Sequence, residues 1–91
     1  MRSIHLEIRG RVQGVGFRWF VRETARALRL RGWVKNRPDG NVEVAAAGSD
    51  EDLQQLADAL GRGPRGAVVE SVEKLPAPDA DSLPEPFTIL R

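Results

Sequence analysis

The chain has 91 residues, enough for one domain with a modest core, and its 41% hydrophobic and 30% charged residues are ordinary for a soluble globular protein. Its net charge of +1 gives it no strong field for nucleic acid or a membrane surface. It contains no cysteine, which excludes disulfides, thiol catalysis and cysteine metal sites, and no apolar run long enough to span a bilayer. Because Met1 to Ser3 lead directly into a strand pattern without a signal peptide, we expect one cytoplasmic domain over residues 1–91 with no membrane partner.

The first half of the chain predicts a strand, a helix and a hairpin. Apolar residues alternate from Ser3 to Val12, which is typical of a half-buried strand. From Phe17 to Leu30 they recur with helical spacing, and Gly32 is expected to end the helix. The stretches Gly32–Arg37 and Asn41–Ala47 predict two further strands, joined by a turn of sequence RPDG.

The second half predicts another helix and two more strands. Ser49 is a good N-cap, and the acidic residues that follow it suit the positive end of a helix. The glycine-rich stretch Gly61–Gly66 is expected to break this helix. Ala67–Leu75 predicts a fourth strand, Pro76–Pro86 a loop, and Phe87–Leu90 a short last strand.

The resulting order, β-α-β-β-α-β with a short extra C-terminal strand, predicts a ferredoxin-like fold of the α+β class. Such a split β-α-β sandwich has an antiparallel sheet with two helices on one face. The second strand then lies parallel to the first, with the third strand between them. The turn after the first strand and Asn36 at the end of the second are therefore expected at one edge of the sheet.

The stretch GRVQGVGFRWF, from Gly10 to Phe20, joins the first strand to the first helix. The first N–H groups of a helix have no internal partner, and the helix dipole adds positive charge there. Gly14 and Gly16 let the turn curl so that successive amides face one point, and Arg18 can clamp two phosphate oxygens. The stretch reads as a phosphate cradle. A glycine-rich turn without ligand is the alternative, since the stretch lacks the residues of a P-loop or a dinucleotide fold.

Asn36 is the second candidate site residue. Its amide oxygen can orient a water molecule while its NH₂ group meets developing negative charge. The alternative is that Asn36 only stabilises the turn that follows it, as asparagine often does.

Other polar and aromatic residues are expected to be structural. The single histidine, His5, is expected on the exposed face of its strand, and the acidic run Asp50–Asp52 is explained by helix capping better than by metal binding. Trp19 and Trp33 are expected to pack partly against the fold, and the Thr24 hydroxyl to bond the preceding helical turn.

Two long motifs resemble the signatures of the acylphosphatase family, small enzymes that hydrolyse carboxyl-phosphate anhydrides. IRGRVQGVGFR, from Ile8 to Arg18, resembles the first signature throughout. GWVKNRPDGNVEVAAAG, from Gly32 to Gly48, resembles the second. The length and the order of elements also fit, so the resemblance covers essentially the whole chain.

The resemblance implies a role for each matching residue. Arg18 would bind the phosphate of a small-molecule acyl phosphate, and Asn36 would hold the attacking water. No metal, cofactor or phosphoenzyme is required in the family. The implied phosphate-binding loop comprises Gln13, Gly14, Val15, Gly16, Phe17 and Arg18.

One alternative function remains open, and a second is disfavoured by the sequence. A related domain could bind phosphate compounds without turnover. An RNA-binding RRM shares this strand order but needs aromatic residues exposed on its central strands. The stretches IHLEIRGRV and NVEVAAAG contain none, so we expect no nucleic-acid partner, and for this size and mechanism we expect a monomer.

Overall fold

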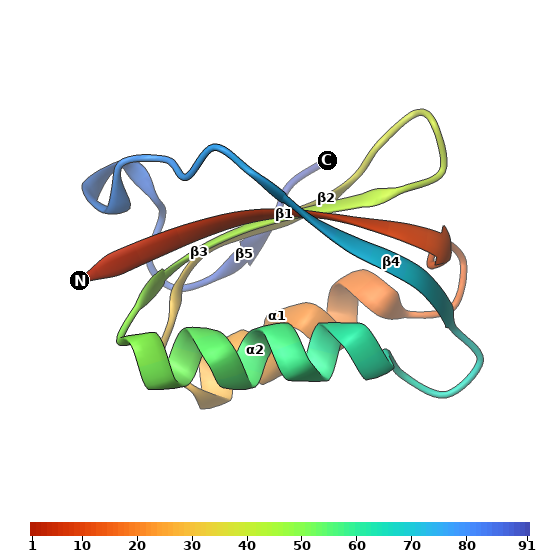
Figure 1. Cartoon of the computed structure of the whole chain (residues 1–91), viewed down its shortest axis with the longest axis horizontal. Helices are drawn as coiled ribbons and strands as arrows, with labels where there is room; N and C mark the ends of the chain where they lie inside the picture. Colours follow the sequence, from red (N-terminus) through yellow and green to blue (C-terminus); the bar gives the residue numbers. More distant parts are fainter.

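The chain runs as strand, helix, two strands, helix and two strands in the computed structural model, which describes all residues from 1 to 91 (Figure 1). Figure 1 shows both helices beneath one face of the sheet. The elements are β1 (Arg2–Arg11), α1 (Phe17–Ala27), β2 (Arg31–Asn36), β3 (Val42–Gly48), α2 (Asp50–Arg62), β4 (Val68–Leu75), a 3₁₀ turn η1 (Ala80–Ser82) and β5 (Thr88–Ile89).

The sheet has five strands in the order β4-β1-β3-β2-β5. β3 pairs antiparallel with both β1 and β2, so β1 and β2 are parallel with β3 between them, as predicted. β5 pairs parallel with β2, with Trp33 opposite Thr88 and Val34 opposite Ile89. The ferredoxin-like α+β fold is confirmed, but the sheet is mixed, so the expectation of an antiparallel sheet is wrong at this edge.

The connection between β4 and β5 explains the parallel edge. β4 ends at Leu75, at the end of the sheet where β1 and β2 begin. The connection is fastened to the beginning of β2, because Arg31 Nε donates to the Leu83 carbonyl at 2.9 Å and Gly32 N–H donates to the Pro84 carbonyl at 2.8 Å. The chain therefore enters the edge beside the start of β2, and β5 runs in the same direction as β2.

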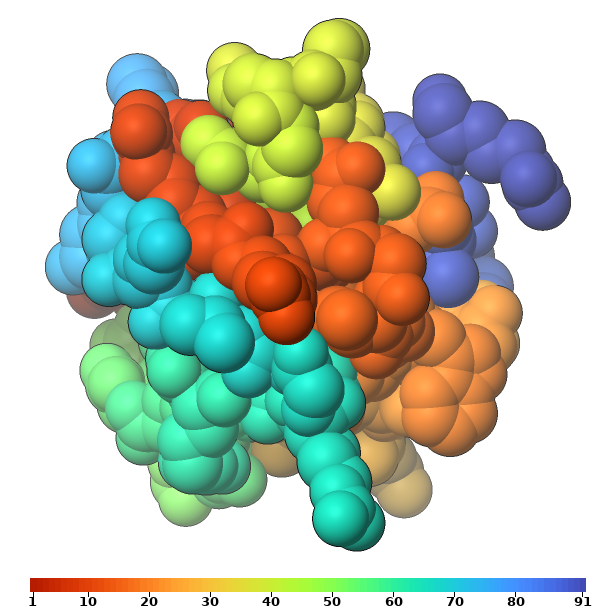
Figure 2. Space-filling model, turned by 90° about the vertical axis from the view of Figure 1, so that its right-hand side faces the viewer, coloured from red at the N-terminus to blue at the C-terminus, as the bar shows by residue number.

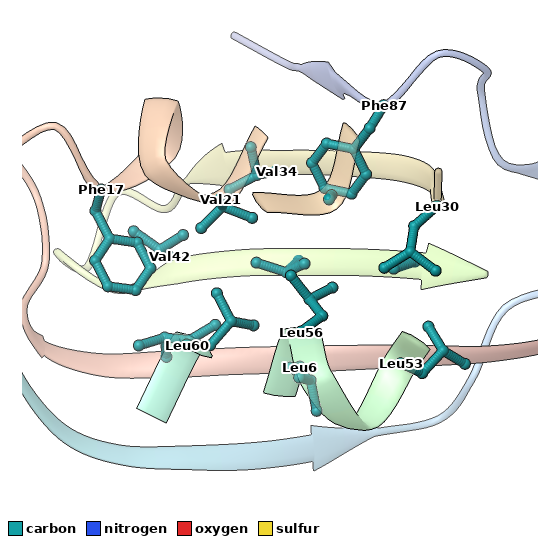
Figure 3. Packing of buried hydrophobic residues seen from close by; sticks show 14 of the residues in the cluster. Leu6, Phe17, Val21, Leu30, Val34, Val42, Leu53, Leu56, Leu60 and Phe87 are labelled. Atoms are coloured by element: carbon teal, nitrogen blue, oxygen red, sulfur yellow. The ribbon is translucent and has the colours of Figure 1, made fainter. Parts of the chain in front are cut away.

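The core lies between the two helices and the covered face of the sheet. Val34 and Val42 from the strands point toward Val21 of α1 and Leu56 of α2 (Figure 3). Phe17, the first residue of α1, is only 1% exposed and packs in the same cluster. Burying such a side chain contributes about 1.5–3 kcal/mol. The start of α1 is thus anchored in the core directly after the glycine-rich turn.

The first helix ends at Ala27, earlier than its apolar spacing predicts. Arg29 adopts a left-handed φ of 57°, and the Leu30 N–H donates back into the last helical turn. Gly32 is a residue of β2 and not the helix stop that we expected. Its φ is 144°, and a Cβ there would lie 2.0 Å from the Ala45 carbonyl oxygen, so glycine is required by the close approach of β3.

The second helix begins and ends as predicted. The Ser49 Oγ accepts a hydrogen bond from the Asp52 N–H at 3.1 Å, which confirms the N-cap. The helix ends at Arg62 with Gly63 as its C-cap, within the stretch Gly61–Gly66 that was expected to break it. Neither helix has the length and apolar character needed to cross a bilayer.

Three further side chains test the expectations of packing. The Thr24 hydroxyl donates to the Phe20 carbonyl at 2.8 Å, as predicted. Trp33 is partly buried on the outer face of the sheet, edge-on to His5 with ring centroids 5.5 Å apart, also as predicted. Trp19 is 58% exposed, so it packs against the fold less than Trp33 does.

The outer face of the sheet holds a partly buried polar cluster. Glu7 on β1 and Glu43 on β3 stand directly opposite each other and are only 7% and 9% exposed. The Asn41 amide donates to Glu7 at 2.7 Å, and the Arg37 guanidinium lies 3.2 Å from Glu43. His5 also bonds Glu43, so it is not the exposed residue that its strand position predicts. These partners offset the repulsion between the two carboxylates.

Candidate active site

The turn between β1 and α1 contains a run of backbone N–H groups that have no partner within the protein. Gly14 and Gly16 adopt left-handed φ angles of 76° and 75°, and Gly16 is the N-cap of α1. No protein acceptor takes a hydrogen bond from the N–H groups of residues 14–19, and the first to donate is that of Phe20, to the Gly16 carbonyl. Together with the helix dipole, this geometry is suited to binding an anion.

Arg18 lies in the first turn of α1, next to these amides. It is partly buried, yet its guanidinium makes no hydrogen bond or ion pair within the protein. Arg22, one turn further along the helix, lies 3.2 Å from Glu23 by contrast. The donors of Arg18 are thus free for a ligand, and their planar fork matches two oxygens of a phosphate.

Asn36 ends β2, where it pairs with Val42 of β3. Its Oδ1 atom is buried and has no hydrogen-bond partner, and it is the one buried side-chain polar atom in the chain in this condition. The turn that follows is closed by Arg37, Gly40 and Asn41 and receives no hydrogen bond from the Asn36 side chain. Leaving such an oxygen unpaired costs about 1–3 kcal/mol, which is expected only where a ligand or water supplies the partner.

A cleft of about 410 Å³ brings these groups together at one end of the sheet. Figure 2 views the molecule from this end, with the red-orange β1–α1 turn in the centre, the orange helix α1 beside it and the blue C-terminal segment at the upper right. The residues lining the cleft are Val12, Gln13, Gly14, Gly16, Phe17, Arg18, Trp19, Arg22, Asn36, Thr88, Ile89 and Arg91.

The Gln13 side chain ties the turn to the hairpin that follows β2. Its Nε2 atom donates to the Arg37 carbonyl at 2.8 Å and to the Asn41 carbonyl at 3.0 Å. These bonds hold the glycine-rich turn in a fixed position relative to Asn36. Sequence reasoning gave Gln13 only a backbone role in the loop, and its side chain has this second, structural one.

The hairpin turn carries a charged pair that also fixes its shape. The Asn41 N–H donates to Asp39 at 3.0 Å, and Arg37 lies 3.2 Å from the same carboxylate. The Asn41 N–H, followed by the Arg37 guanidinium, holds the pKa of Asp39 below its usual range. The hydrogen bond with Asp39 likewise raises the pKa of Arg37.

Asp39→Asn is expected to destabilise the protein at neutral pH but not in strong acid. The folded-state pKa of Asp39 is depressed, so its contribution is present above the unfolded-state value of about 3.9 and is lost as the pH falls through the lower folded value. Thermal unfolding of the wild type and of Asp39→Asn, at pH 7 and at decreasing pH, measures the difference in stability. A difference in Tm that stays constant into strong acid would contradict it.

The acylphosphatase family model matches residues 4–89, nearly the whole chain. The chain belongs to the acylphosphatase family. It is 51% identical to the acylphosphatase of Nitratidesulfovibrio vulgaris over 81 residues, which cover 88% of this chain and 81% of that relative. It is 41% identical to the acylphosphatase of Rhizobium etli over 87 residues, or 96% of this chain and 92% of the relative.

Solved acylphosphatase structures share the fold. The crystal structure of acylphosphatase from Bacillus subtilis superimposes with a TM-score of 0.82 and 38% identity, and the match covers 100% of both chains. The resemblance seen in the two sequence motifs is confirmed, and the comparisons support an acylphosphatase enzyme.

The residues expected from the acylphosphatase signatures meet in one place, with one exception. Gln13, the two glycines of the turn, Phe17, Arg18 and Asn36 all line the cleft. Val15 does not line it, and its side chain packs partly against the core.

The chain has no group of three or more histidine or carboxylate side chains placed to hold a metal ion.

Several lining residues were missed by reasoning from sequence. Arg22 follows Arg18 by four residues and therefore lies on the same face of α1, a signal that helical spacing does provide. Thr88, Ile89 and Arg91 reach the cleft only because β5 pairs with β2. No local pattern predicts that pairing.

Proposed function

We propose that this chain hydrolyses acyl phosphates to a carboxylate and inorganic phosphate. The observation that carries the proposal is the convergence on one cleft of the unbonded turn amides, the unpaired Arg18 and the buried, unpaired Oδ1 of Asn36. Membership of the acylphosphatase family supports the same reaction.

The turn and Arg18 would hold the phosphoryl group. Phosphoryl transfer has a loose transition state with charge spread over the peripheral oxygens, so positioning and charge stabilisation supply most of the catalysis. The N–H groups of residues 14–19 make no hydrogen bond within the protein, so they are free to donate to a phosphate without breaking one. Such preorganised donors are worth about 3–4 kcal/mol each.

Asn36 would orient the attacking water by accepting one of its hydrogens on Oδ1. The water oxygen bonds to phosphorus as the bond from phosphorus to the acyl oxygen breaks. The leaving carboxylate is a weak base and departs without a general acid. Asn36 cannot take a proton at neutral pH, and no aspartate, glutamate or histidine lines the cleft. The proton of the water therefore passes to a phosphate oxygen of the substrate.

The test is hydrolysis of benzoyl phosphate by the purified protein, followed by ultraviolet absorbance in the presence of EDTA. We expect turnover that EDTA does not reduce, and a pH–rate profile without an essential enzyme group titrating near neutrality. No turnover, while inorganic phosphate still raises the Tm, would overturn the proposal and favour the alternative of a phosphate-binding module without catalysis.

Gln13→Ala is expected to lower kcat/KM for benzoyl phosphate about tenfold. It removes two hydrogen bonds of about 1 kcal/mol each, and the turn can then shift relative to Asn36. Steady-state kinetics measures the effect. The matched control is Gln54→Ala, which removes an exposed bond to Asp58 within α2 and should leave kinetics unchanged. If the two variants had equal kcat/KM, the hydrogen bonds from Gln13 to the hairpin would have no role in catalysis.

A further inference from the structure

The cleft extends well beyond the phosphate cradle. Its volume of about 410 Å³ exceeds what a phosphoryl group needs, since a water molecule takes only about 30 Å³ of liquid. The lining residues that lie outside the glycine turn include Trp19 and Arg22 of α1 and Ile89 and Arg91 at the C-terminal edge, and we call the part of the cleft that they line its outer part. On the proposed function, this outer part would receive the acyl group of the substrate.

The charge in this outer part is positive. Arg22 and Arg91 line the cleft in addition to Arg18, and no aspartate or glutamate side chain lines it. Arg22 contacts Glu23 only through its Nε atom, at 3.2 Å, so the ends of its guanidinium remain available. Arg91 is exposed and makes no ion pair. The cleft therefore holds more cationic groups than the phosphate alone would use.

We propose that the outer part of the cleft is a subsite for a carboxylate carried on the acyl group, so that the preferred substrates are monophosphorylated dicarboxylic acids. Arg22 and Arg91 would bind the distal carboxylate, while Trp19 and Ile89 would contact the carbon chain or ring between the two ends. This inference rests on the proposed function and adds the class of acyl group to it.

The test compares two substrates that differ only at the far end of a rigid acyl group. Para-carboxybenzoyl phosphate carries the second carboxylate, para-carbamoylbenzoyl phosphate is its neutral counterpart, and neither can cyclise onto its own phosphate. We expect the ratio of their kcat/KM values to favour the carboxylate at low salt. The ratio should fall about three- to fivefold in Arg22→Gln and in Arg91→Gln, and also on adding salt.

Arg65→Gln is the matched control. It removes the same charge from an exposed arginine that lies outside the cleft and makes no ion pair, so the ratio should be kept. An equal fall in Arg65→Gln would show a general effect of net charge and would overturn the subsite. A ratio that Arg22→Gln and Arg91→Gln leave unchanged would overturn it as well.

Failure of the proposed function gives a different result, namely no turnover of either compound. Binding of para-carboxybenzylphosphonate and para-carbamoylbenzylphosphonate, measured by calorimetry, then tests the subsite without hydrolysis. Tighter binding of the carboxylate that is lost in Arg22→Gln and Arg91→Gln would support the subsite. Equal affinities for the two phosphonates would overturn it.

Discussion

Arg18→Ala is expected to lower kcat/KM for benzoyl phosphate about a thousandfold, or about 4 kcal/mol. The side chain lies beside the free amides of the turn and has no hydrogen-bond or ion-pair partner in the protein, so its donors are available in full to the phosphate. Inorganic phosphate should bind correspondingly more weakly. Steady-state kinetics and phosphate titration by calorimetry measure the two effects.

Arg18→Lys separates charge from geometry. Lysine keeps the charge but lacks the fork that meets two oxygens, so we expect partial recovery of phosphate binding and little recovery of turnover. Neither variant should change the free energy of unfolding by more than about 0.5 kcal/mol, because Arg18 makes no hydrogen bond or ion pair that would be lost. Unchanged phosphate affinity in Arg18→Ala would contradict the assigned role.

Asn36→Ala is expected to lower kcat by about 10²–10³-fold while the affinity for inorganic phosphate stays within a factor of about two. The same variant should be as stable as the wild type or more stable, since it removes the unpaired Oδ1 from a buried position. Higher stability with lost activity is the pattern expected of a residue kept for chemistry. Chemical unfolding measures the stability of the variant, and single-turnover kinetics measures its loss of activity.

Asn36→Asp provides the informative control. The carboxylate has nearly the same shape and can still accept from water, but it places a negative charge beside the bound phosphate. We expect phosphate affinity to fall in Asn36→Asp and to stay in Asn36→Ala. If Asn36→Ala lost phosphate affinity as Arg18→Ala does, Asn36 would be a phosphate ligand and the water-holding role would be wrong.

The parts of the fold that depend on local patterns could be predicted from the sequence. Alternating apolar residues predict β1, and helical spacing together with the Ser49 cap predicts α2. The parallel pairing of β5 could not be predicted, because a strand of two residues carries no directional pattern. Gly32 was misinterpreted as a helix stop for a related reason. Glycine is required there because the Ala45 carbonyl of β3 approaches closely, and this contact between distant parts of the sequence is not visible in a local pattern.

The difference between local sequence patterns and contacts between distant parts of the chain also applies to the site and to the outer face of the sheet. Gly14, Gly16 and Arg18 lie in one short motif, and sequence spacing alone places them together. The burial of Glu7 opposite Glu43 could not be foreseen, because the groups that compensate it come from other strands and turns. The contributions of β5 to the cleft depend on the pairing that the sequence does not indicate.

The cleft takes no residue from between Asn36 and Thr88. The segment from Ser49 to Leu75, with α2 and β4, thus serves the core and the sheet alone. Positions such as Gln54, Gln55 and Asp58 are exposed and lie outside the cleft. Substitutions there should combine additively with changes around the cleft. The chain therefore separates the residues around the cleft from a central segment in which stability and solubility can change without altering the cleft.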